Sequence, residues 1–454
     1  MTAAPPSDTL DAIFKAYDVR GIYPDQIDES IARLVGNAFV AFTGAATILV
    51  GRDARPSSEP LVEAFVDGAR LAGADVVDLG LASTDLVYFA AGSLDAPAAM
   101  FTASHNPAEY NGIKLCRAGA APVGEDTGLG QLKAIVAEGL LERAEEPGRH
   151  ERRDLLAPFV NHVRSFVDVD ALAPLRVVTD TANGVGGLIV PAVFSGLPVE
   201  LSMLYAELDG TFPNHPANPI DVANLRDLQH EVTATKADVG LAFDGDADRV
   251  FLVDDRAVPV SGSTTTAILA KAMLERSPGG IVVHNLICSR AVPEVIRENG
   301  GTPVRTRVGH SFIKAVMAET DAVFGGEHSA HYYFRDNWRA DSGIIAAMIV
   351  LEQLSRAGVP LSEFRAPFER YAASGEVNTR VADPSAVIDE VAAAFPDAEQ
   401  DRLDGLTVQF DDWWFNLRPS NTEPLLRLNV EAADAAMCEE CTARVQALMG
   451  DEAD

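Results

Sequence analysis

The sequence has little cysteine, no apolar run long enough for a membrane and little positive charge, and each shortage excludes a class of protein. Four cysteines in 454 residues are too few for a disulfide framework. Two of them form the spacing CEEC (438–441) in a helical pattern without a second pair, so we expect packed thiols and no zinc. The apolar run GIIAAMIVL (343–351) is about half a membrane span. Because the N-terminus has neither a basic start nor an apolar core, we expect a cytoplasmic protein without a leader peptide.

Positive charge is scarce: 36 Lys and Arg stand against 67 Asp and Glu, which gives a formal net charge of −31. Such a chain repels phosphate backbones and anionic lipid, so we expect no nucleic acid and no membrane as general partners. A small phosphorylated substrate stays compatible, because it needs only a local cationic pocket. The oligomeric state, monomer or homodimer, is left open.

Strand-like runs and amphipathic helical runs alternate along most of the chain, which is the rhythm of β-α-β units. The rhythm restarts after a charged, helix-prone segment (140–156) and again near residue 258, and the C-terminal part has short strands with helices between them. We predict an α/β protein with three related domains of mixed, mostly parallel sheets and a smaller α+β C-terminal domain. The expected domains are 1–152, 153–256, 257–370 and 371–454.

The segment LAFDGDADRVFLVDD (241–255) carries three alternating aspartates, Asp244, Asp246 and Asp248. An extended loop could point all three carboxylates at one hard cation. A helix–loop–helix Ca²⁺ site is excluded because Arg249 stands where the sixth position needs glycine, and because the flanks are strand-like. A solvated acidic turn is the alternative. Three carboxylates beside an arginine suit Mg²⁺ next to a phosphoryl group.

Three further stretches carry functional side chains. FTASHNPAEYNG (101–112) places a serine after an apolar run, either in a plain turn or as an exposed hydroxyl. RPSNTEP (418–424) offers a guanidinium, hydroxyls and an amide that suit a phosphate, although such residues also simply form turns. GGEHSAHYYF (325–334) combines groups for gripping sugar hydroxyls with a histidine for proton transfer, and it lacks the helical spacing of a zinc protease.

In the order AYDVRG, TASHNP, DGDADR, GEHSAH and RPSNTEP, these stretches resemble the α-D-phosphohexomutase superfamily, and within it the phosphomannomutase/phosphoglucomutase branch. The resemblance runs from about residue 14 to the C-terminal strands. It implies four domains around a central cleft. It also implies that Ser104 carries a phosphoryl group and binds Mg²⁺ together with Asp244, Asp246 and Asp248.

The implied activity is that of a phosphomannomutase, which interconverts mannose 1-phosphate and mannose 6-phosphate through phosphoserine and a hexose 1,6-bisphosphate, with glucose phosphates as further candidate substrates. The implied ligands are small sugar phosphates, with Mg²⁺ as cofactor and the bisphosphate as activator. The implied catalytic residues are Ser104, Lys114, Arg20, Arg249, His310 and His331. The implied substrate-binding residues are Glu327, Ser329, Arg418, Ser420, Asn421 and Thr422. The identity of the general base is left open.

The alternatives are a phosphoglucomutase, a phosphoglucosamine mutase and a non-catalytic protein that binds metal or sugar phosphate. GEHSAH looks more like the mannose-handling members than the GEQSGH of phosphoglucosamine mutases. A serine hydrolase is disfavoured because TASHNP lacks G-x-S-x-G. One departure concerns the sugar contacts: Ile287 stands where family members often have lysine, and whether Arg290 compensates is open. Ala103 replaces a frequent glycine.

Overall fold

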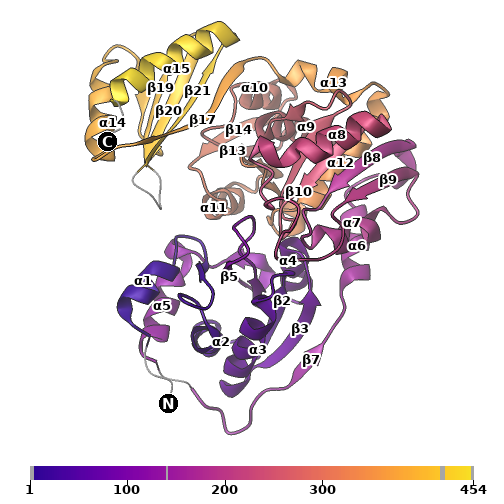
Figure 1. Ribbon diagram of the computed structural model, residues 1–454, viewed down its shortest axis with the longest axis vertical. Coiled ribbons are helices and arrows are strands. Elements are labelled where there is room, and N and C mark those ends of the chain that lie inside the picture. The colour runs from indigo at the N-terminus through magenta and orange to yellow at the C-terminus, as the bar shows by residue number, and fades with distance from the viewer. Residues whose placement is uncertain (1–4, 140–141, 420–424, 451–454) are drawn as a thin grey trace. The chain divides into compact units, whose positions relative to one another are not determined.

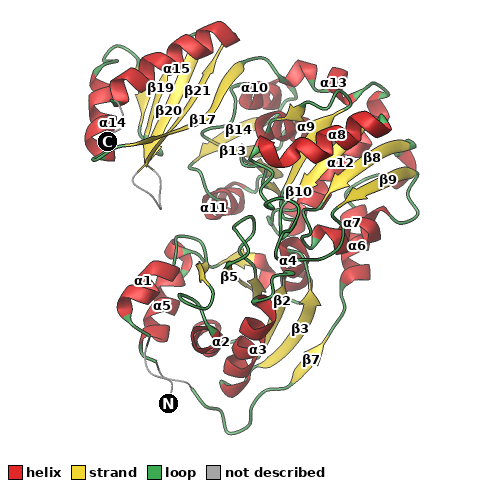
Figure 2. Cartoon of the chain, in the orientation of Figure 1, coloured by secondary structure: helices red, strands yellow, loops and turns green. Residues whose placement is uncertain are grey.

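The computed structural model of the chain describes residues 5–139, 142–419 and 425–450 (Figure 1). The chain divides into two compact units. Unit 1 is Met1–Ser261 with Ser329–Phe364, and unit 2 is Gly262–His328 with Arg365–Asp454. Helices flank the sheets in both units (Figure 2). The four domain boundaries predicted above stay a prediction.

The first sheet of unit 1 has the strand order β1-β5-β4-β2-β3-β7, with β6 beside β5. Strand β2 is parallel to β3 and β4, and β7 is parallel to β3, whereas β5 is antiparallel to β1, β4 and β6. The strands are β1 (Val19–Ile22), β2 (Thr47–Arg52), β3 (Asp75–Leu81), β4 (Ala98–Phe101), β5 (Tyr110–Arg117), β6 (Ala121–Pro122) and β7 (His150–Arg152).

Apolar side chains from four helices form one continuous core with this sheet. These helices are α1 (Ser7–Ile13), α2 (Glu29–Thr43), α3 (Ser58–Leu71) and α5 (Leu129–Ala137). Helix α2 begins where the Asp28 side chain accepts a hydrogen bond from the Ile31 amide, and it ends at Gly44, whose φ of 64° is left-handed. A further helix, α4 (Thr84–Ser93), contacts β2 and β4.

The charged segment before the second sheet differs from the prediction. In its described part β7 is the only regular element before α6 begins at the last residue, Leu156, so the helix-prone interpretation of 140–156 is wrong for the residues ahead of Leu156. Strand β7 adds to the edge of the first sheet next to β3. Backbone hydrogen bonds from Val76 to the Arg149 carbonyl and from Arg153 to the Asp78 carbonyl fix it there. The exposed ion pairs Arg149–Asp75 and Arg152–Asp78 accompany them and contribute little stability.

The second sheet of unit 1 has the order β12-β11-β10-β8-β9, in which β10, β8 and β9 are parallel and β11 and β12 are antiparallel additions. All five residues of β10 are buried, as expected for a central strand. The strands are β8 (Leu175–Asp180), β9 (Val199–Leu204), β10 (Val239–Phe243), β11 (Val250–Asp254) and β12 (Pro259–Val260). The other elements of this part are α6 (Leu156–Arg164), α7 (Gly186–Phe194), α8 (Arg226–Thr235), β16 (Tyr332–Phe334), α12 (Gly343–Ala357) and α13 (Leu361–Phe364).

Unit 2 contains a parallel run of strands, β14-β13-β15, and a separate antiparallel sheet, β17-β21-β20-β19-β18. The elements of the parallel part are α9 (Gly262–Arg276), β13 (Ile281–Asn285), α10 (Ala291–Glu298), β14 (Thr302–Thr306), α11 (His310–Thr320) and β15 (Phe324–Gly326). The elements of the antiparallel part are β17 (Ala372–Arg380), α14 (Pro384–Ala393), β18 (Glu399–Asp401), β19 (Leu406–Gln409), β20 (Trp413–Pro419), β21 (Leu425–Ala432) and α15 (Ala435–Met449). The predicted fold class, three α/β parts and a distinct C-terminal sheet, is confirmed.

Two composition-based expectations can be compared with this fold. Cys438 and Cys441 lie on α15 with their side chains in the C-terminal core, as expected for packed thiols.

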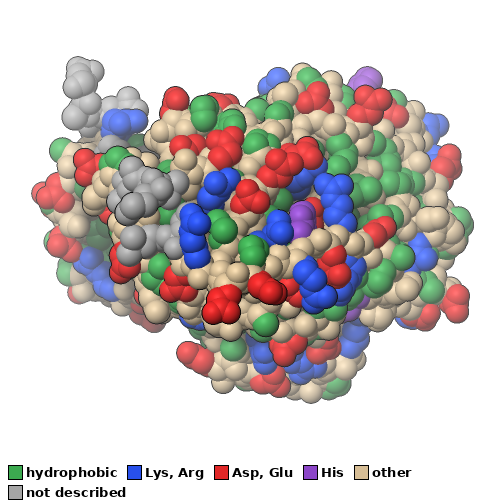
Figure 3. Space-filling view, turned by 90° about the horizontal axis from the view of Figure 1, so that it is seen from below, with side chains coloured by type: hydrophobic (Ala, Val, Ile, Leu, Met, Phe, Trp, Pro, Cys, Tyr) green, Lys and Arg blue, Asp and Glu red, His purple; other side chains and the backbone are tan. Residues whose placement is uncertain are grey.

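Within the described residues no single helix is long and apolar enough to cross a membrane, and one bent pair, Gly343–Ala357 with Leu361–Phe368, could do so by length and composition only. Acidic and basic side chains are interspersed over the face drawn in Figure 3, so the acidic excess is spread out there.

Candidate active site

The serine stretch forms the loop between β4 and β5, at the carboxyl end of β4. Ser104 is 5% exposed and has a left-handed φ of 50°. Its amide donates to Thr102 Oγ1 over 2.9 Å. Its hydroxyl donates to Asp244 Oδ2 over 2.8 Å and accepts from Arg249 Nη2 over 3.3 Å. The serine and the aspartate loop are thus direct neighbours although 140 residues separate them in the chain.

His105 lies beside the serine hydroxyl and completes its surroundings. Its Nδ1 is 3.2 Å from Ser104 Oγ and 2.6 Å from Arg249 Nη2. Burial and the neighbouring positive charge of Arg249 lower the pKa of His105, so the ring is neutral and Nδ1 accepts the arginine N–H.

The aspartate stretch is the turn of a hairpin between β10 and β11, whose register pairs Phe243 with Val250. Asp244, Asp246 and Asp248 are at most 1% exposed, and each offers an oxygen within 4.8 Å of the others. The turn therefore converges three buried carboxylates on one point, as the alternating pattern predicts.

Positive charge and one hydroxyl reach the aspartate cluster from other elements. Lys114 Nζ, on β5, lies 2.8 Å from Asp246 Oδ2 and 2.6 Å from Asp248 Oδ2. Thr84 Oγ1, at the start of α4, donates to Asp246 Oδ2 over 2.6 Å. Arg249 Nε donates to Asp244 Oδ2 over 2.9 Å. Three carboxylates thus face two cations, which leaves an excess of negative charge.

The cluster meets the requirements of a divalent metal. Among the described residues, Oδ1 of Asp246 and Oδ1 of Asp248 are buried and accept no hydrogen bond. Buried carboxylate oxygens without a donor are costly unless a cation occupies the space between them. Hard oxygen donors with a net negative charge suit Mg²⁺.

The pKa values follow from this crowding. Burial raises the pKa of Asp244 to about 7, and the charges of Asp248 and Asp246 act in the same direction while Arg249 opposes them. Burial would also raise the pKa of Asp246, but Lys114 outweighs it and holds that pKa well below the usual range. Burial would lower the pKa of Lys114, but Asp246 and Asp248 raise it well above the ordinary value.

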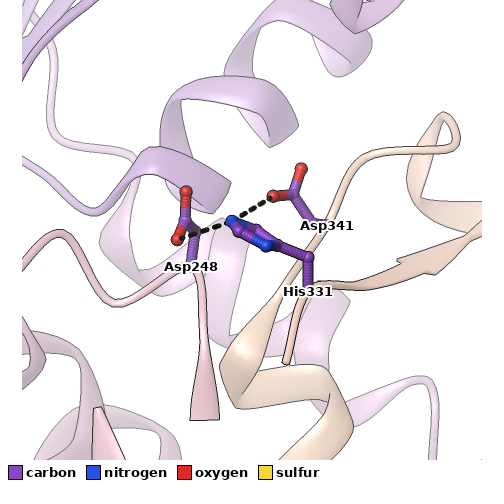
Figure 4. A group of neighbouring side chains, drawn as sticks. All are labelled: Asp248, His331 and Asp341. Atoms are coloured by element: carbon purple, nitrogen blue, oxygen red, sulfur yellow. Dashed lines mark ion pairs between the residues drawn. The ribbon is translucent and has the colours of Figure 1, made fainter. Parts of the chain in front are cut away.

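A histidine from the GEHSAH stretch reaches the same cluster. His331 Nε2 lies 3.9 Å from Asp248 Oδ1 and 4.0 Å from Asp341 Oδ2, and its ring stands between the two carboxylates (Figure 4). Its Nδ1 is 3.2 Å from Ser329 Oγ. Asp248 is therefore shared between the aspartate cluster and a second group with His331 and Asp341.

Arg20 lies at the edge of the serine loop. It belongs to β1, and its Nη1 donates to Asn106 Oδ1 over 2.7 Å, while Asp18 forms an ion pair with it. The structure thus brings together, within unit 1, Arg20, Ser104, Lys114, Asp244, Asp246, Asp248, Arg249 and His331.

Ser329 also belongs to unit 1, where its Oγ lies beside His331, and the remaining predicted residues belong to unit 2. Glu327 follows β15, is 2% exposed and accepts from Asn285 Nδ2 over 3.2 Å. His310 is the first residue of α11. Arg418, on β20, is 6% exposed and donates to Asn429 Oδ1 over 2.9 Å and to Glu376. Ser420, Asn421 and Thr422 lie outside the described residues.

Comparison with known proteins decides the family. Models of the phosphoglucomutase/phosphomannomutase family match in chain order: alpha/beta/alpha domain I at 11–141, domain II at 157–257, domain III at 261–371 and the C-terminal domain at 376–448. A phosphomannomutase of Salmonella montevideo is 39% identical in an alignment of 448 residues that covers 96% of this chain and 98% of the relative. This chain belongs to the phosphoglucomutase/phosphomannomutase family.

Further relatives agree with this assignment. The phosphohexose mutases of Xanthomonas campestris are 41% identical over 442 residues, which cover 96% of this chain and 98% of theirs. The crystal structure of a phosphoglucomutase/phosphomannomutase family protein from Burkholderia thailandensis superposes with a TM-score of 0.87 at 32% identity, covering 96% of this chain and 97% of that one. The family predicted from the motifs is confirmed, and with it an isomerase that transfers a phosphoryl group.

The structure answers whether Arg290 compensates for the missing lysine at Ile287. The Arg290 side chain donates to three backbone carbonyls, those of Phe410, Asp411 and Trp413, over 2.6, 3.0 and 3.2 Å. Its guanidinium is therefore held by the loop between β19 and β20. This phosphohexomutase family member does not present Arg290 as a free cation in place of the lysine.

Sequence reasoning missed three side chains of the site: Thr84, Asp341 and Arg55. Thr84 follows Ser83, which caps α4, so the Ser-Thr-Asp run was a detectable helix start but not a detectable metal neighbour. Asp341 precedes Ser342, the N-cap of α12, and carries no motif of its own. Arg55 lies in GRDARP between β2 and α3, where nothing in the sequence distinguishes it from a surface arginine.

Proposed function

We propose that this chain is a phosphomannomutase, which interconverts mannose 1-phosphate and mannose 6-phosphate through a phosphoserine at Ser104 and a hexose 1,6-bisphosphate. The observation that carries the proposal is the direct contact of the Ser104 hydroxyl with Asp244 and Arg249 of the aspartate loop. A serine with a purely structural role in the loop after a strand would not need a buried carboxylate cluster in contact with its hydroxyl group. Relatives of comparable length that are named phosphomannomutase support the choice of mannose.

The proposed reaction has two transfers that balance each other. In the first, the bond between phosphorus and Ser104 Oγ breaks, and phosphorus bonds to the free hydroxyl oxygen of the sugar monophosphate, whose proton goes to a base. In the second, the bond between the other phosphorus and its sugar oxygen breaks, that phosphorus bonds to Ser104 Oγ, and the sugar oxygen takes up a proton from an acid. Arg249, which already donates to that oxygen, would neutralise charge on it in both steps.

The acidic residues have a separate role. Asp244, Asp246 and Asp248 would hold Mg²⁺, which supplies positive charge against the phosphoryl oxygens when bound. Lys114 is protonated in the metal-free cluster, because two carboxylates raise its pKa. It is therefore suited to supply positive charge and poorly suited either to accept a proton or to give one up. That leaves Arg20, His310 and His331 as the other candidates for proton handling and charge stabilisation.

Substrate contacts are assigned by the family motifs. Glu327 and Ser329 would bind sugar hydroxyls, and Arg418 would bind the phosphate that does not react, together with Ser420, Asn421 and Thr422. Arg418 already has a negatively charged partner in Glu376, so phosphate would have to compete with that ion pair.

Phosphorus NMR tests the proposal. Mannose 1-phosphate, glucose 1-phosphate and glucosamine 1-phosphate are followed separately with Mg²⁺ and a trace of the matching 1,6-bisphosphate. Fast conversion of the mannose ester with slow conversion of the others supports the proposal. Equal rates for mannose and glucose would make the protein a dual mutase, and preference for glucosamine would overturn the substrate.

A serine variant separates catalysis from binding. Ser104→Ala should abolish conversion and the incorporation of phosphate from labelled bisphosphate, while thermal stability stays close to that of the wild type. Should the wild type convert none of the three esters after priming with bisphosphate, the non-catalytic binding protein becomes the better interpretation.

A further inference from the structure

Arg55 is a buried arginine whose guanidinium donates most of its hydrogen bonds to backbone carbonyls of the serine loop. Its Nη2 donates to the carbonyls of Ser104 and Asn106 over 2.9 and 2.7 Å. Its Nη1 donates to the carbonyls of Pro107 and Tyr110 over 2.6 and 3.0 Å. One planar group thus fixes four carbonyls between the end of β4 and the start of β5.

The remaining donor of Arg55 and its charge are matched by Asp53. Arg55 Nε donates to Asp53 Oδ2 over 3.0 Å, in an ion pair whose two side chains are 0% and 2% exposed. Asp53 Oδ1 in turn accepts from Ser58 Oγ over 2.6 Å, at the start of α3. The Asp53 amide donates to the carbonyl of Phe101, the last residue of β4. The arginine is therefore anchored to the rigid elements β4 and α3.

The segment that follows β9 closes over the guanidinium. The Phe212 ring lies with its centroid 5.0 Å from Arg55 Cζ. Gly210 approaches so closely that a Cβ there would stand 2.3 Å from Arg55 Cα. The group is thus enclosed by packed side chains and backbone, where hydrogen bonds from a charged donor are strong and their loss is costly.

Ser104 is the loop residue that most needs such support. Its φ of 50° is left-handed, a conformation that a serine keeps only when its surroundings enforce it. The Arg55 Nη2 bonds fall on the carbonyl of Ser104 itself and on that of Asn106. They restrict the peptide planes on which the direction of the Ser104 side chain depends.

We propose that Arg55 is a positioning residue for phosphoryl transfer: by binding four carbonyls of the serine loop, it fixes Ser104 Oγ at the aspartate cluster. The proposal rests on the proposed function, since it assumes that Ser104 carries the transferred group. Lysine cannot replace this arginine, because a single ammonium lacks the planar fork that reaches four carbonyls and a carboxylate together. The role is specific to the geometry of the guanidinium and not to its charge.

The test compares Arg55→Lys with a matched control, Arg164→Lys. Arg164 also donates from a helix to backbone carbonyls, to Val193 over 3.0 and 2.8 Å and to Ser195, but none of these belongs to the serine loop. Three kinds of measurement are made on each variant: steady-state kinetics with sugar phosphate for kcat and KM, the thermal midpoint, and hydrogen exchange of the loop amides within 104–110, where Pro107 has no N–H.

For Arg55→Lys we expect kcat to fall on the order of 100-fold, because a displacement of about 1 Å at a reacting atom has that effect. KM should stay within about threefold, since the sugar contacts are unchanged. Exchange of amides 104–110 should rise while the rest of the chain stays protected. Arg164→Lys should lower the thermal midpoint and leave kcat within about twofold.

Three results would overturn the inference: a kcat within about threefold of wild type in Arg55→Lys, an activity loss equal to the unfolded fraction, or the same kcat loss in both variants. Failure of the proposed function is distinguishable, because the wild type itself would then convert no sugar phosphate. In that case the exchange of amides 104–110 still decides whether Arg55 holds the loop, and unchanged protection refutes it.

Discussion

Removing Lys114 tests the charge balance of the aspartate cluster. Its Nζ lies 2.8 Å from Asp246 and 2.6 Å from Asp248, and its side chain is 13% exposed while theirs are 0% and 1%. In Lys114→Met the cluster keeps three carboxylates but only the charge of Arg249. Taking one partner from a buried ion pair costs about 3–5 kcal/mol, because the other charge stays buried and unpaired. Without metal, we expect unit 1 to lose that much stability.

Mg²⁺ should reverse a large part of this loss. A cation between the carboxylates replaces the missing charge, and the more negative cluster of the variant should bind it more tightly. Binding stabilises both proteins, so at saturating metal the deficit shrinks by about 1.4 kcal/mol for each tenfold by which the variant binds Mg²⁺ more tightly. The deficit of the variant relative to wild type should therefore be large in EDTA and clearly smaller in Mg²⁺.

Differential scanning calorimetry in EDTA and in Mg²⁺ measures both effects. A loss of 3–5 kcal/mol corresponds to a shift of the unit 1 transition on the order of 10 °C. Lys236→Met, at an exposed lysine after α8, serves as the control and should shift neither transition. Equal deficits of Lys114→Met in EDTA and in Mg²⁺, or no deficit in EDTA, would refute the reasoning that Lys114 and the metal serve the same carboxylates.

Three further predictions concern pH and packing. Burial lowers the pKa of His284 to about 4, so as pH falls the unfolded state takes up the proton first, and the stability present above pH 6.5 is lost as pH falls toward 4. His284→Gln should remove about 3 kcal/mol of this pH dependence from the stability of unit 2, measured by its melting. An unchanged pH profile would contradict this prediction. Burial raises the pKa of Asp85 to about 7, so the stability of unit 1 depends on pH in the opposite direction at this residue. The stability contribution present below pH 3.8 is lost as pH rises to 7. Asp85→Asn should abolish that fall in unit 1, again followed by calorimetry across pH, and a profile parallel to wild type would count against it. A Cβ at Gly343 would stand 2.6 Å from the backbone carbonyl carbon of Arg249, so Gly343→Ala should displace the aspartate loop. We expect this variant to lose about 1–3 kcal/mol of stability in unit 1 and to have a lower kcat. A wild-type kcat in the folded variant would contradict this prediction.

The types of local structure and the chemical groups of the site could be predicted from the sequence, because each depends on a short pattern of neighbouring residues. The alternation of Asp244, Asp246 and Asp248 between apolar segments favoured a buried turn with converging carboxylates over a solvated acidic turn, and the hairpin of β10 and β11 forms that turn. The β-α-β rhythm predicted the α/β parts and the different C-terminal sheet. The CEEC spacing within a helical pattern predicted thiols packed in a core. Each of these features depends on residues close together in the chain.

The described segment before the second sheet shows where local patterns fail. Charged residues there have good helix propensity, yet β7 forms because its backbone pairs with the open edge of β3. Propensity is a weak preference of a fraction of a kcal/mol per residue, and edge pairing outweighs it.

Only the tertiary structure decided which side chains share a site. Lys114 is 132 residues from Asp246, and Thr84 is 162 residues from it, yet both bind the same carboxylate. Arg55 carries no motif, and its four carbonyl partners become visible only when the loop after β4 is folded against the start of α3. Such contacts depend on how strands and helices pack, which fixes distances that chain order does not encode. The sequence by itself therefore determined the chemical groups and the family, while packing decided how those groups are charged, held and aimed.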